Sequence, residues 1–347
     1  MTQLALIAPG RRVTPSACRV LPADANEADW LRARRRGIGS SDVAAILGVA
    51  ERRTALHVWY DKRDRLPDDD AGEPALWGHL HEDTVAREWA RRNRSTVRRV
   101  GLVAHTEHTW RLCTLDRQIG ICPLDRTHTA TTACALEVKT RNAWVAGKWR
   151  RSVPDDVLAQ VVWEMAVTGY EHIHVACLIG GNDYRQYVIR RDAELEADIV
   201  AGVETFWTTN VIGGARPAVD TQAYADDLMS LDNRLHPDRG GAAILAATSR
   251  PWELVDDYEE TRLAVKGATA RHKAAKVALI EALDGREMAL VDEGRGDQPM
   301  WTYLERRQAP GVDLALMAEQ HPDAYAACVS ERAGRVLDIA RDLRHTD

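Results

Sequence analysis

The sequence predicts an α/β fold in which helices flank a mixed central β-sheet, followed by a mainly helical C-terminal extension. Three observations lead to this prediction. Apolar residues recur at helical spacing over most of the region before residue 93. Short segments rich in Val, Ile, Leu and Thr follow over 96–140. After them, the pattern predicts a helix, two strands and another helix. This order of elements favours a mixed sheet.

The N-terminal region contains helices with clear start and stop signals. Residues 1–25 show no sustained period, and we expect them to form a loose arm. A helix over 26–36 ends at Gly37, a short apolar helix over 43–47 follows, and Thr54 is placed to cap a helix that reaches Lys62. The segment 77–92 is strongly amphipathic and predicts a longer helix.

The period then changes from helical to strand-like. Segments 96–105, 110–115, 119–124 and 134–140 predict a β-meander. Residues 155–168 return to helical spacing and end at Gly169. Segments 172–179 and 184–190 flank a Gly-Gly-Asn-Asp turn and predict a hairpin, and 193–210 predicts a further helix.

Composition shifts near Pro217, so we predict a core over 26–217 and an extension over 218–347. A long helix over 257–283 and a small hairpin from 288–291 and 300–304 are expected in that extension. No run approaches the roughly 18 apolar residues of a membrane span. Because the first residues also lack the features of a signal peptide, a cytoplasmic location without a membrane partner is expected.

Six cysteines are scattered through the chain without a C-x-x-C pair, which argues against a disulfide framework or a zinc ribbon. Cys113, Cys122 and Cys134 lie near one another in the sequence, so an iron–sulfur cluster is an alternative. We favour the interpretation that they are small buried residues in strands.

The net charge of -6 does not exclude a nucleic-acid enzyme, because a local basic surface can bind phosphate. The basic residues are clustered within 32–36, 91–99 and 148–151, all in the first half, whereas the second half carries an acidic run at 256–260. A surface that binds phosphate is therefore expected in the first half.

The segment Ala135-Leu-Glu-Val-Lys-Thr140 carries the first chemical signal. On a strand, Glu137 and Lys139 point to the same face, whereas Leu136 and Val138 point to the other. A carboxylate beside an ammonium on a buried strand is costly unless a function uses it, such as holding a divalent cation and orienting a water. A Glu-x-Lys triplet alone arises by chance about a third of the time, so an edge-strand ion pair explains it equally well.

Asp116 supplies the second signal, because it ends the predicted strand 110–115 and precedes Glu137. Mg²⁺ takes oxygen ligands and generally binds one or two carboxylates. Asp125 is a rival, but it lies in a Pro-Leu-Asp-Arg segment that is equally typical of a turn, so we prefer Asp116.

Several motifs in order make the signal specific. Asp116, Glu137-Val-Lys139 and Gln160 resemble the P-D…(D/E)-x-K…Q arrangement of the lambda-exonuclease and YqaJ-type viral recombinase family. Three further segments also resemble family motifs: Trp30…Arg34…Gly37-Ile-Gly-Ser-Ser-Asp42, Trp77-Gly-His-Leu-His-Glu82, and Gln160-Val-Val-Trp-Glu-Met-Ala-Val-Thr-Gly169. The likeness covers roughly residues 28–340 and implies a restriction-endonuclease-like core.

The resemblance implies roles for individual residues. Asp116 and Glu137 would be the principal metal ligands, with the Val138 carbonyl and Glu82 as additional ones. Lys139 would position or deprotonate the attacking water, and Gln160 would hold Lys139 or the scissile phosphate. The terminal 5′-phosphate would be bound by three residues: Arg34, Ser40 and Ser41. The two serines lie at a predicted helix start, where free N–H groups favour an anion.

The implied activity is an Mg²⁺-dependent DNA exonuclease, with Mn²⁺ as an alternative ion, that digests double-stranded ends 5′ to 3′ for phage-type recombination. A single-strand-annealing partner, a homo-oligomer and the cytoplasm of a bacterial host are further implications. An endonuclease or repair nuclease of the same superfamily, and a catalytically inactive DNA-binding or assembly module, remain alternatives.

Two features depart from the family pattern. The segment Thr114-Leu-Asp-Arg117 lacks the family's proline and glycine around the aspartate. Glu164 follows Gln160 by one turn and either supports the site or is solvated.

Overall fold

The computed structural model describes residues 10–67, 72–124, 134–238, 240, 242–292, 297–305, 313–329, 337–340 and 343–344. The chain divides into two compact units, Met1–Arg239 and Gly240–Asp347. The first unit contains the predicted core, and the second contains most of the predicted C-terminal extension.

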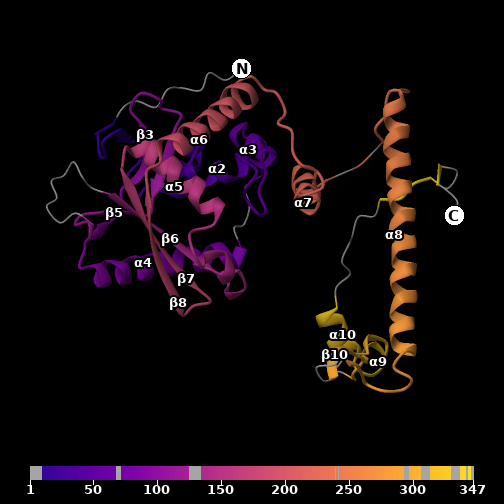
Figure 1. The fold of residues 1–347 in the computed structure, drawn as a ribbon. Coiled ribbons are helices and arrows are strands. Elements are labelled where there is room, and N and C mark those ends of the chain that lie inside the picture. The colour runs from indigo at the N-terminus through magenta and orange to yellow at the C-terminus, as the bar shows by residue number, and fades with distance from the viewer. Residues whose placement is uncertain are drawn as a thin grey trace. The chain divides into compact units, whose positions relative to one another are not determined.

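The first unit is built on a five-stranded mixed sheet with the order β2-β5-β6-β7-β8 (Figure 1). Strands β6 and β7 pair in parallel, whereas the other neighbours are antiparallel. The prediction of an α/β fold with a mixed central sheet is therefore confirmed. The five strands are β2 (Val97–Arg98), β5 (Arg117–Ile119), β6 (Cys134–Arg141), β7 (His172–Ile179) and β8 (Asp183–Arg190).

A second, three-stranded antiparallel sheet has the order β1-β3-β4. It consists of β1 (Ala17–Arg19), β3 (Gly101–His105) and β4 (Leu112–Leu115). The prediction of one continuous meander is wrong, because segment 96–105 divides between the two sheets and β4 does not pair with β5. The predicted strand 119–124 is also displaced, since β5 occupies Arg117–Ile119.

The N-terminal region contributes strand β1 to that sheet. Ala17 pairs with His105 and is completely buried, so the prediction of a loose arm over 1–25 is wrong for this strand. Its pairing partner lies more than eighty residues away in sequence, and local periodicity carries no signal of such a partner. Residues 1–9 lie outside the described residues.

Two helices cover opposite faces of the central sheet (Figure 1). Helix α4 (Gly72–Asn93) packs Val85 and Trp89 against Leu136 and Val138 of β6. Helix α5 (Asp155–Thr168) packs on the other face, in the cluster that contains Ala135. Because side chains alternate along a strand, the even-numbered residues of β6 face α4 and the odd-numbered ones face α5.

The remaining helices of this unit lie around the same core. They are α1 (Glu27–Arg34), α2 (Ser40–Ile46), α3 (Ala55–Lys62), η1 (Ala143–Trp149), α6 (Ala193–Thr205), η2 (Phe206–Ile212) and α7 (Ala225–Leu235). Thr54 is the N-cap residue of α3, as the sequence predicts, whereas α2 begins at Ser40, three residues before the start predicted for that helix.

The first unit continues beyond the boundary expected between residues 217 and 218. Leu231 of α7, a helix that the periodicity analysis did not predict, is buried in the main hydrophobic cluster. The Tyr224 hydroxyl lies 3.0 Å from the Gly48 carbonyl oxygen and 2.9 Å from that of Ala50. Helix α7 is amphipathic, but only its packing in the main hydrophobic cluster shows that its apolar face belongs to this core.

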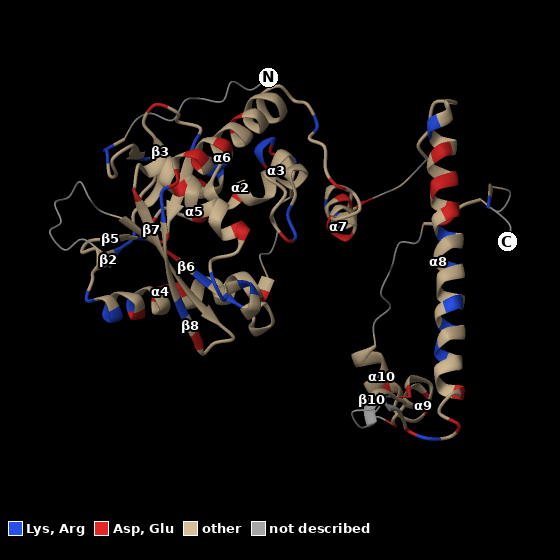
Figure 2. Ribbon diagram, viewed as in Figure 1, with Lys and Arg blue, Asp and Glu red and all other residues tan. Residues whose placement is uncertain are grey.

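The second unit contains a long helix, a hairpin and two short helices. These are α8 (Ser249–Glu281), β9 (Met288–Asp292), β10 (Asp297–Thr302), α9 (Leu314–Gln320) and α10 (Pro322–Cys328). Acidic residues gather in the N-terminal half of α8, and basic residues dominate after them (Figure 2). The predicted mainly helical extension is confirmed. Within the described part of the chain, no helix has the length and apolar character to cross a membrane.

Helix α5 ends at Gly169, which adopts the left-handed conformation with φ of 73° and donates its N–H to the Met165 carbonyl oxygen at 2.8 Å. An added Cβ would lie 2.8 Å from Ser16 Oγ and 3.1 Å from Pro15 Cβ. Gly181 has a similar φ of 80°, but nothing lies within 4 Å of its Cβ position. Comparing alanine substitutions at the two glycines therefore distinguishes the cost of backbone strain from the cost of steric contact.

We predict that Gly169→Ala lowers the free energy of unfolding by about 2–4 kcal/mol, because strain and steric contact add. Gly181→Ala should cost about 1 kcal/mol from strain alone. Urea denaturation measures both values. Equal losses would show that the contact with Pro15 and Ser16 relaxes freely.

Candidate functional site

Strand β6 places a carboxylate and an ammonium side by side inside the first unit. Glu137 is only 2% exposed, and its Oε1 accepts a hydrogen bond from Lys139 Nζ. Both side chains lie on the α5 face, whereas Leu136 and Val138 pack under α4. This is the arrangement that strand alternation predicts. The central position of β6, between β5 and β7, argues against an edge-strand ion pair.

Gln160 on α5 connects these two side chains. Lys139 Nζ donates to Gln160 Oε1 at 2.8 Å, and Gln160 Nε2 donates to Glu137 Oε1 at 2.6 Å. The same amide nitrogen lies 3.0 Å from Glu164 Oε1, one helical turn further on. One amide thus holds the lysine and two carboxylates, and its position on the helix after β6 is the one expected from the sequence.

Asp116 lies at the junction of the two sheets, between β4 and β5. Its Oδ2 accepts a hydrogen bond from the Val138 backbone N–H at 2.7 Å. The β5–β6 ladder covers Cys134 to Leu136, so Asp116 contacts β6 just beyond the last paired residue. The N–H and C=O of one strand residue point to the same side, so the Val138 carbonyl points to the side of β6 on which Asp116 lies.

Two carboxylate oxygens at this centre are buried without a hydrogen-bond partner: Glu137 Oε2 and Glu164 Oε2. Glu164 is completely buried, so the alternative that it is solvated is wrong. A buried, unpartnered carboxylate oxygen is costly, and a bound cation would remove that cost. The donor set, with oxygen atoms only, fits a hard divalent cation such as Mg²⁺.

The shifted pKa values of the side chains at this centre also support a site for a cation. Burial raises the pKa of Asp116 well above its usual value, and the neighbouring Glu137 and Glu82 raise it further. Burial and Glu137 also raise the pKa of Glu164. Burial alone would lower the pKa of Lys139, but Glu137 and Asp116 outweigh it and raise that pKa. Lys139 is therefore an ammonium at neutral pH, and the carboxylates repel one another.

Glu82 on α4 lies near Asp116 but has a partner of its own. Its Oε1 accepts a hydrogen bond from Arg117, whose guanidinium also donates to the Asp116 carbonyl oxygen at 2.6 Å and to Asp83 at 3.2 Å. Arg117 is only 3% exposed. The sequence analysis did not select it, because nothing local shows that the residue after Asp116 turns toward α4.

The carboxylates are more widely spaced than a compact metal-binding cage. Among the described residues, only a group of cysteines and histidines places its ligand atoms within 4.8 Å of one another. A cation at the β6 centre would therefore be held by one or two carboxylates together with other oxygen atoms, as is typical of Mg²⁺. Asp125, the rival of Asp116, lies outside the described residues.

Arg34 on α1 belongs to a second charged group. Its guanidinium lies 3.0 Å from Asp42 Oδ1 and packs over the Trp30 ring at 5.1 Å from the ring centroid. Asp42 is completely buried and also contacts Lys62 at 2.7 Å and Arg53 at 3.1 Å. Burial by itself raises the pKa of Asp42, but Lys62, Arg34 and Arg53 together hold it well below its usual range.

The two serines expected beside Arg34 differ in accessibility. Ser40 begins α2 and is buried, whereas Ser41 is exposed. The structure also adds Arg53 and Lys62 to this group, which the sequence analysis did not select. They lie on segments after α2, so their approach to Asp42 depends on how α3 packs.

The first unit is an α/β domain whose mixed sheet carries a centre of carboxylates, one lysine and one glutamine. Comparisons with known proteins identify the family to which such a domain belongs. Residues 29–171 match the YqaJ-like viral recombinase domain. The chain is 32% identical over 317 residues to the uncharacterized protein YqaJ of Bacillus subtilis (strain 168), covering 90% of this chain and 93% of that protein. The chain therefore belongs to the YqaJ-like viral recombinase family, which confirms the resemblance inferred from the motifs.

Solved structures show a more distant likeness. The alkaline exonuclease LHK-Exo from Laribacter hongkongensis matches 61% of this chain and all of its own chain, with a TM-score of 0.43 and 17% identity. The structure of SSO0001 matches 52% of this chain and 85% of its own, with a TM-score of 0.32 and 12% identity. At these scores the likeness assigns no function.

The raised pKa of Glu164 leads to a stability prediction. A carboxyl group whose pKa is raised on folding destabilises the fold once the pH exceeds its unfolded value of about 4.3, and increasingly so up to its folded pKa. Glu164→Gln removes this charge and keeps the side-chain shape. Without divalent ions at pH 7, we expect the variant to unfold with a free energy about 1 kcal/mol or more above that of the wild type.

The advantage of Glu164→Gln should shrink as the pH falls toward 4, because the wild-type carboxyl then binds a proton in both states. Urea denaturation at several pH values measures it. Glu171→Gln, at a carboxylate whose side chain is 79% exposed, is the matched control. A Glu164→Gln variant that is no more stable than the wild type at pH 7 contradicts the assignment of a repulsive, buried charge.

Proposed function

We propose that the protein is an Mg²⁺-dependent DNA exonuclease that digests double-stranded ends 5′ to 3′ and leaves single strands for phage-type recombination. One observation carries the proposal: Glu137 and Glu164 each bury an unpartnered carboxylate oxygen next to Lys139 and Gln160. Asp116 joins them through the Val138 backbone. Family membership supports recombination as the context.

Mg²⁺, or Mn²⁺ in its place, would be held by Asp116, Glu137 and the Val138 carbonyl. Glu164 is close enough to share the ion's field, and Glu82 would contribute from α4 when Arg117 releases it. When bound, the ion would make water a stronger nucleophile and offset negative charge on the scissile phosphate. The two unpartnered carboxylate oxygens could bind such an ion without breaking an existing hydrogen bond.

Lys139 would act as a positively charged positioning group. Its raised pKa keeps the ammonium protonated, so it donates hydrogen bonds to the attacking water or to a phosphate oxygen rather than removing a proton. Gln160 holds Lys139 through its Oε1 atom and keeps Glu137 in place through its Nε2 atom. In the reaction, the water oxygen would bond to phosphorus, the bond from phosphorus to the leaving ester oxygen would break, and the proton lost by the water would be balanced by one that the leaving oxygen takes up from solvent.

The terminal 5′-phosphate would be bound near Arg34, Ser41 and Ser40. Four positive charges, from Arg34, Arg35, Arg53 and Lys62, surround three carboxylates, those of Asp42, Asp61 and Asp64. This leaves one positive charge in excess at a site where an anion would be attracted. The exposed Ser41 hydroxyl is accessible to a ligand, whereas the buried Ser40 would act through its backbone.

The wider implications of the family resemblance remain part of this proposal. A single-strand-annealing protein would bind the product strand, and a homo-oligomer would keep the enzyme on one duplex. The reaction would take place in the cytoplasm of a bacterial host if the gene is carried by a phage. The basic clusters of the first unit would line the DNA path, where binding weakens as salt rises.

We predict that Asp116→Ala, Glu137→Ala and Lys139→Ala each reduce Mg²⁺-dependent digestion of linear duplex DNA by at least about 100-fold, because each removes a group that acts on the reacting phosphate. The assay measures the release of nucleotides from end-labelled duplex, with and without Mg²⁺. Circular dichroism checks that each variant is folded, and Glu171→Ala is the control with full activity.

Covalently closed circles distinguish the two kinds of nuclease. An exonuclease leaves them intact, whereas their cleavage would favour an endonuclease of the same superfamily. Full activity in all three variants would remove the catalytic assignment, and calorimetry that detects no Mg²⁺ binding to the wild type would favour an inactive DNA-binding module.

A separate prediction concerns Arg34. We expect Arg34→Ala to slow digestion of 5′-phosphorylated ends by about 10-fold or more relative to unphosphorylated ends, since a charge-assisted hydrogen bond is lost. The measurement is the ratio of the two rates, which does not depend on how much of the variant is folded. Arg32→Ala, on the same helix, serves as the control because Arg32 pairs with Asp29, outside this charged group, and its side chain is 68% exposed. An unchanged ratio for Arg34→Ala contradicts a role in binding the phosphate.

A further inference from the structure

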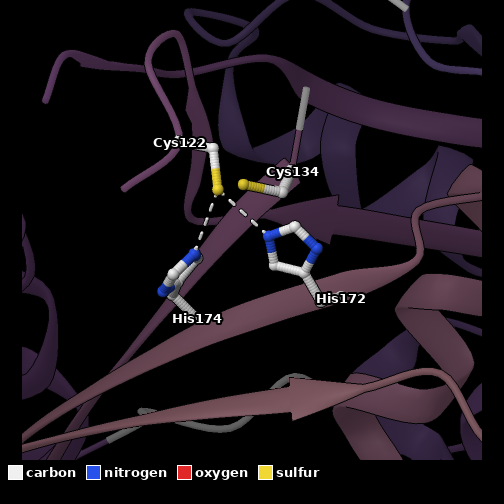
Figure 3. Close-up of side chains that lie close together, drawn as sticks. All are labelled: Cys122, Cys134, His172 and His174. Carbon is white, nitrogen blue, oxygen red and sulfur yellow. Dashed lines mark hydrogen bonds between the residues drawn. The ribbon is translucent and has the colours of Figure 1, made fainter. Parts of the chain in front are cut away.

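Four metal-ligating side chains meet on the face of the central sheet that α4 covers: Cys122, Cys134, His172 and His174 (Figure 3). One ligand atom from each lies within 4.8 Å of all the others. Cys122 Sγ is 3.1 Å from His172 Nε2 and 3.5 Å from His174 Nε2. Figure 3 shows both imidazoles directed at the Cys122 sulfur, with the Cys134 sulfur beside it.

The sheet brings these side chains together from separate parts of the chain. Cys134 begins β6 and pairs with Ile119, and Cys122 follows the end of β5 by a few residues. His172 and His174 are two apart on β7, so they point to the same face. His174 lies opposite Leu136 in the parallel β6–β7 ladder, on the same face as Cys134.

Three of the four side chains are buried, and His172 is partly exposed. Cys122, Cys134 and His174 are at most 3% exposed, and the His174 ring packs against Trp89 of α4 with centroids 5.1 Å apart. Burial raises the pKa of the Cys134 thiol and lowers the pKa of His174 to about 4. Without an ion both side chains are therefore neutral at pH 7, which lets an apolar interior accommodate them.

We propose that these four residues bind one Zn²⁺ ion as a structural site. Two sulfur and two imidazole ligands are the donor set of tetrahedral zinc, whereas Mg²⁺ requires oxygen ligands. Four protein ligands leave no open position for a substrate. The site is therefore structural rather than catalytic.

The geometry distinguishes a single ion from a two-iron cluster. In a [2Fe–2S] centre with two cysteines and two histidines, the cysteines bind one iron and the histidines the other. Here Cys122 Sγ lies within 3.5 Å of both imidazole nitrogens, as expected when sulfur and nitrogen share one ion. Cys113, the third cysteine of the iron–sulfur alternative, is buried elsewhere in the main core cluster.

The ion would join the N-terminal ends of β6 and β7 to the segment after β5. These strands also position Asp116, Glu137 and Lys139, but on the opposite face of β6. Cys134 and Glu137 are three residues apart, about 10 Å along the strand. The zinc site thus clamps the strands that carry the carboxylate centre without sharing a ligand with it.

The experiment measures zinc in the full-length protein, purified under reducing conditions without a metal-affinity column. Elemental analysis should find about one zinc per chain in the wild type and in Cys177→Ser, which changes a buried cysteine of β7 outside the group. Cys122→Ser and Cys134→Ser should bind zinc at least about 100-fold more weakly in a chelator competition, since even losing a supporting contact costs 10–100-fold. Cobalt added to the metal-free wild type should give the absorption of a tetrahedral, thiolate-bound ion.

Two further measurements keep the test decisive. Glu137→Gln should retain zinc, so loss of zinc in that variant would place the ion at the carboxylate centre and overturn the proposal. If the cysteine variants do not fold, mass mapping of alkylated cysteines in the wild type replaces them: a chelator should expose Cys122 and Cys134 but leave Cys113 and Cys177 unchanged. A wild type that binds no zinc, holds iron or copper instead, or forms a Cys122–Cys134 disulfide under these conditions also overturns it.

Discussion

The candidate active site depends on one constraint: β6 must bury the Glu137 carboxylate beside the Lys139 ammonium on the face that α5 covers. A buried ion pair of this kind is tolerated only when its remaining polar atoms find partners. Gln160 supplies most of them from α5, and Asp116 contacts the strand just beyond the end of its ladder with β5. The crossover from β6 through α5 to β7 therefore serves the fold and the site together.

The centre remains electrostatically incomplete without a cation. Two carboxylate oxygens have no partner, and the pKa values of Asp116 and Glu164 are raised by burial and by their neighbours. Such a cluster opposes folding unless a positive charge joins it. Active sites commonly lower the stability of a fold in this way, because the charges that the reaction needs are unfavourable in the folded protein alone.

Strand β6 separates two kinds of ligand chemistry. Its α5 face carries the Glu137 carboxylate, whose oxygen atoms would suit a hard ion, and its α4 face begins with Cys134, which lies close to His172 and His174 of the parallel neighbour. Because alternate residues point to opposite faces, the two groups do not compete for the same ion. The Arg34 group is a third charged centre, where Arg34, Arg53 and Lys62 all contact the buried carboxylate of Asp42.

Local patterns in the sequence determined the helices α1, α3 and α5, the strands β6 and β7, and the shared face of Glu137 and Lys139, because caps, periods and alternation act over a few residues. The order of motifs also identified the family and placed Asp116 and Gln160 beside that pair.

Only the tertiary structure decided that residues 17–19 form a strand, that the meander divides into two sheets and that α7 belongs to the first unit. The same holds for Arg117 at Glu82, the burial of Glu164 and the meeting of Cys122 with His172 and His174. Each of these features depends on which distant segment packs alongside. That packing is determined by the burial of apolar surface over the whole core, and not by residues that are neighbours in the sequence.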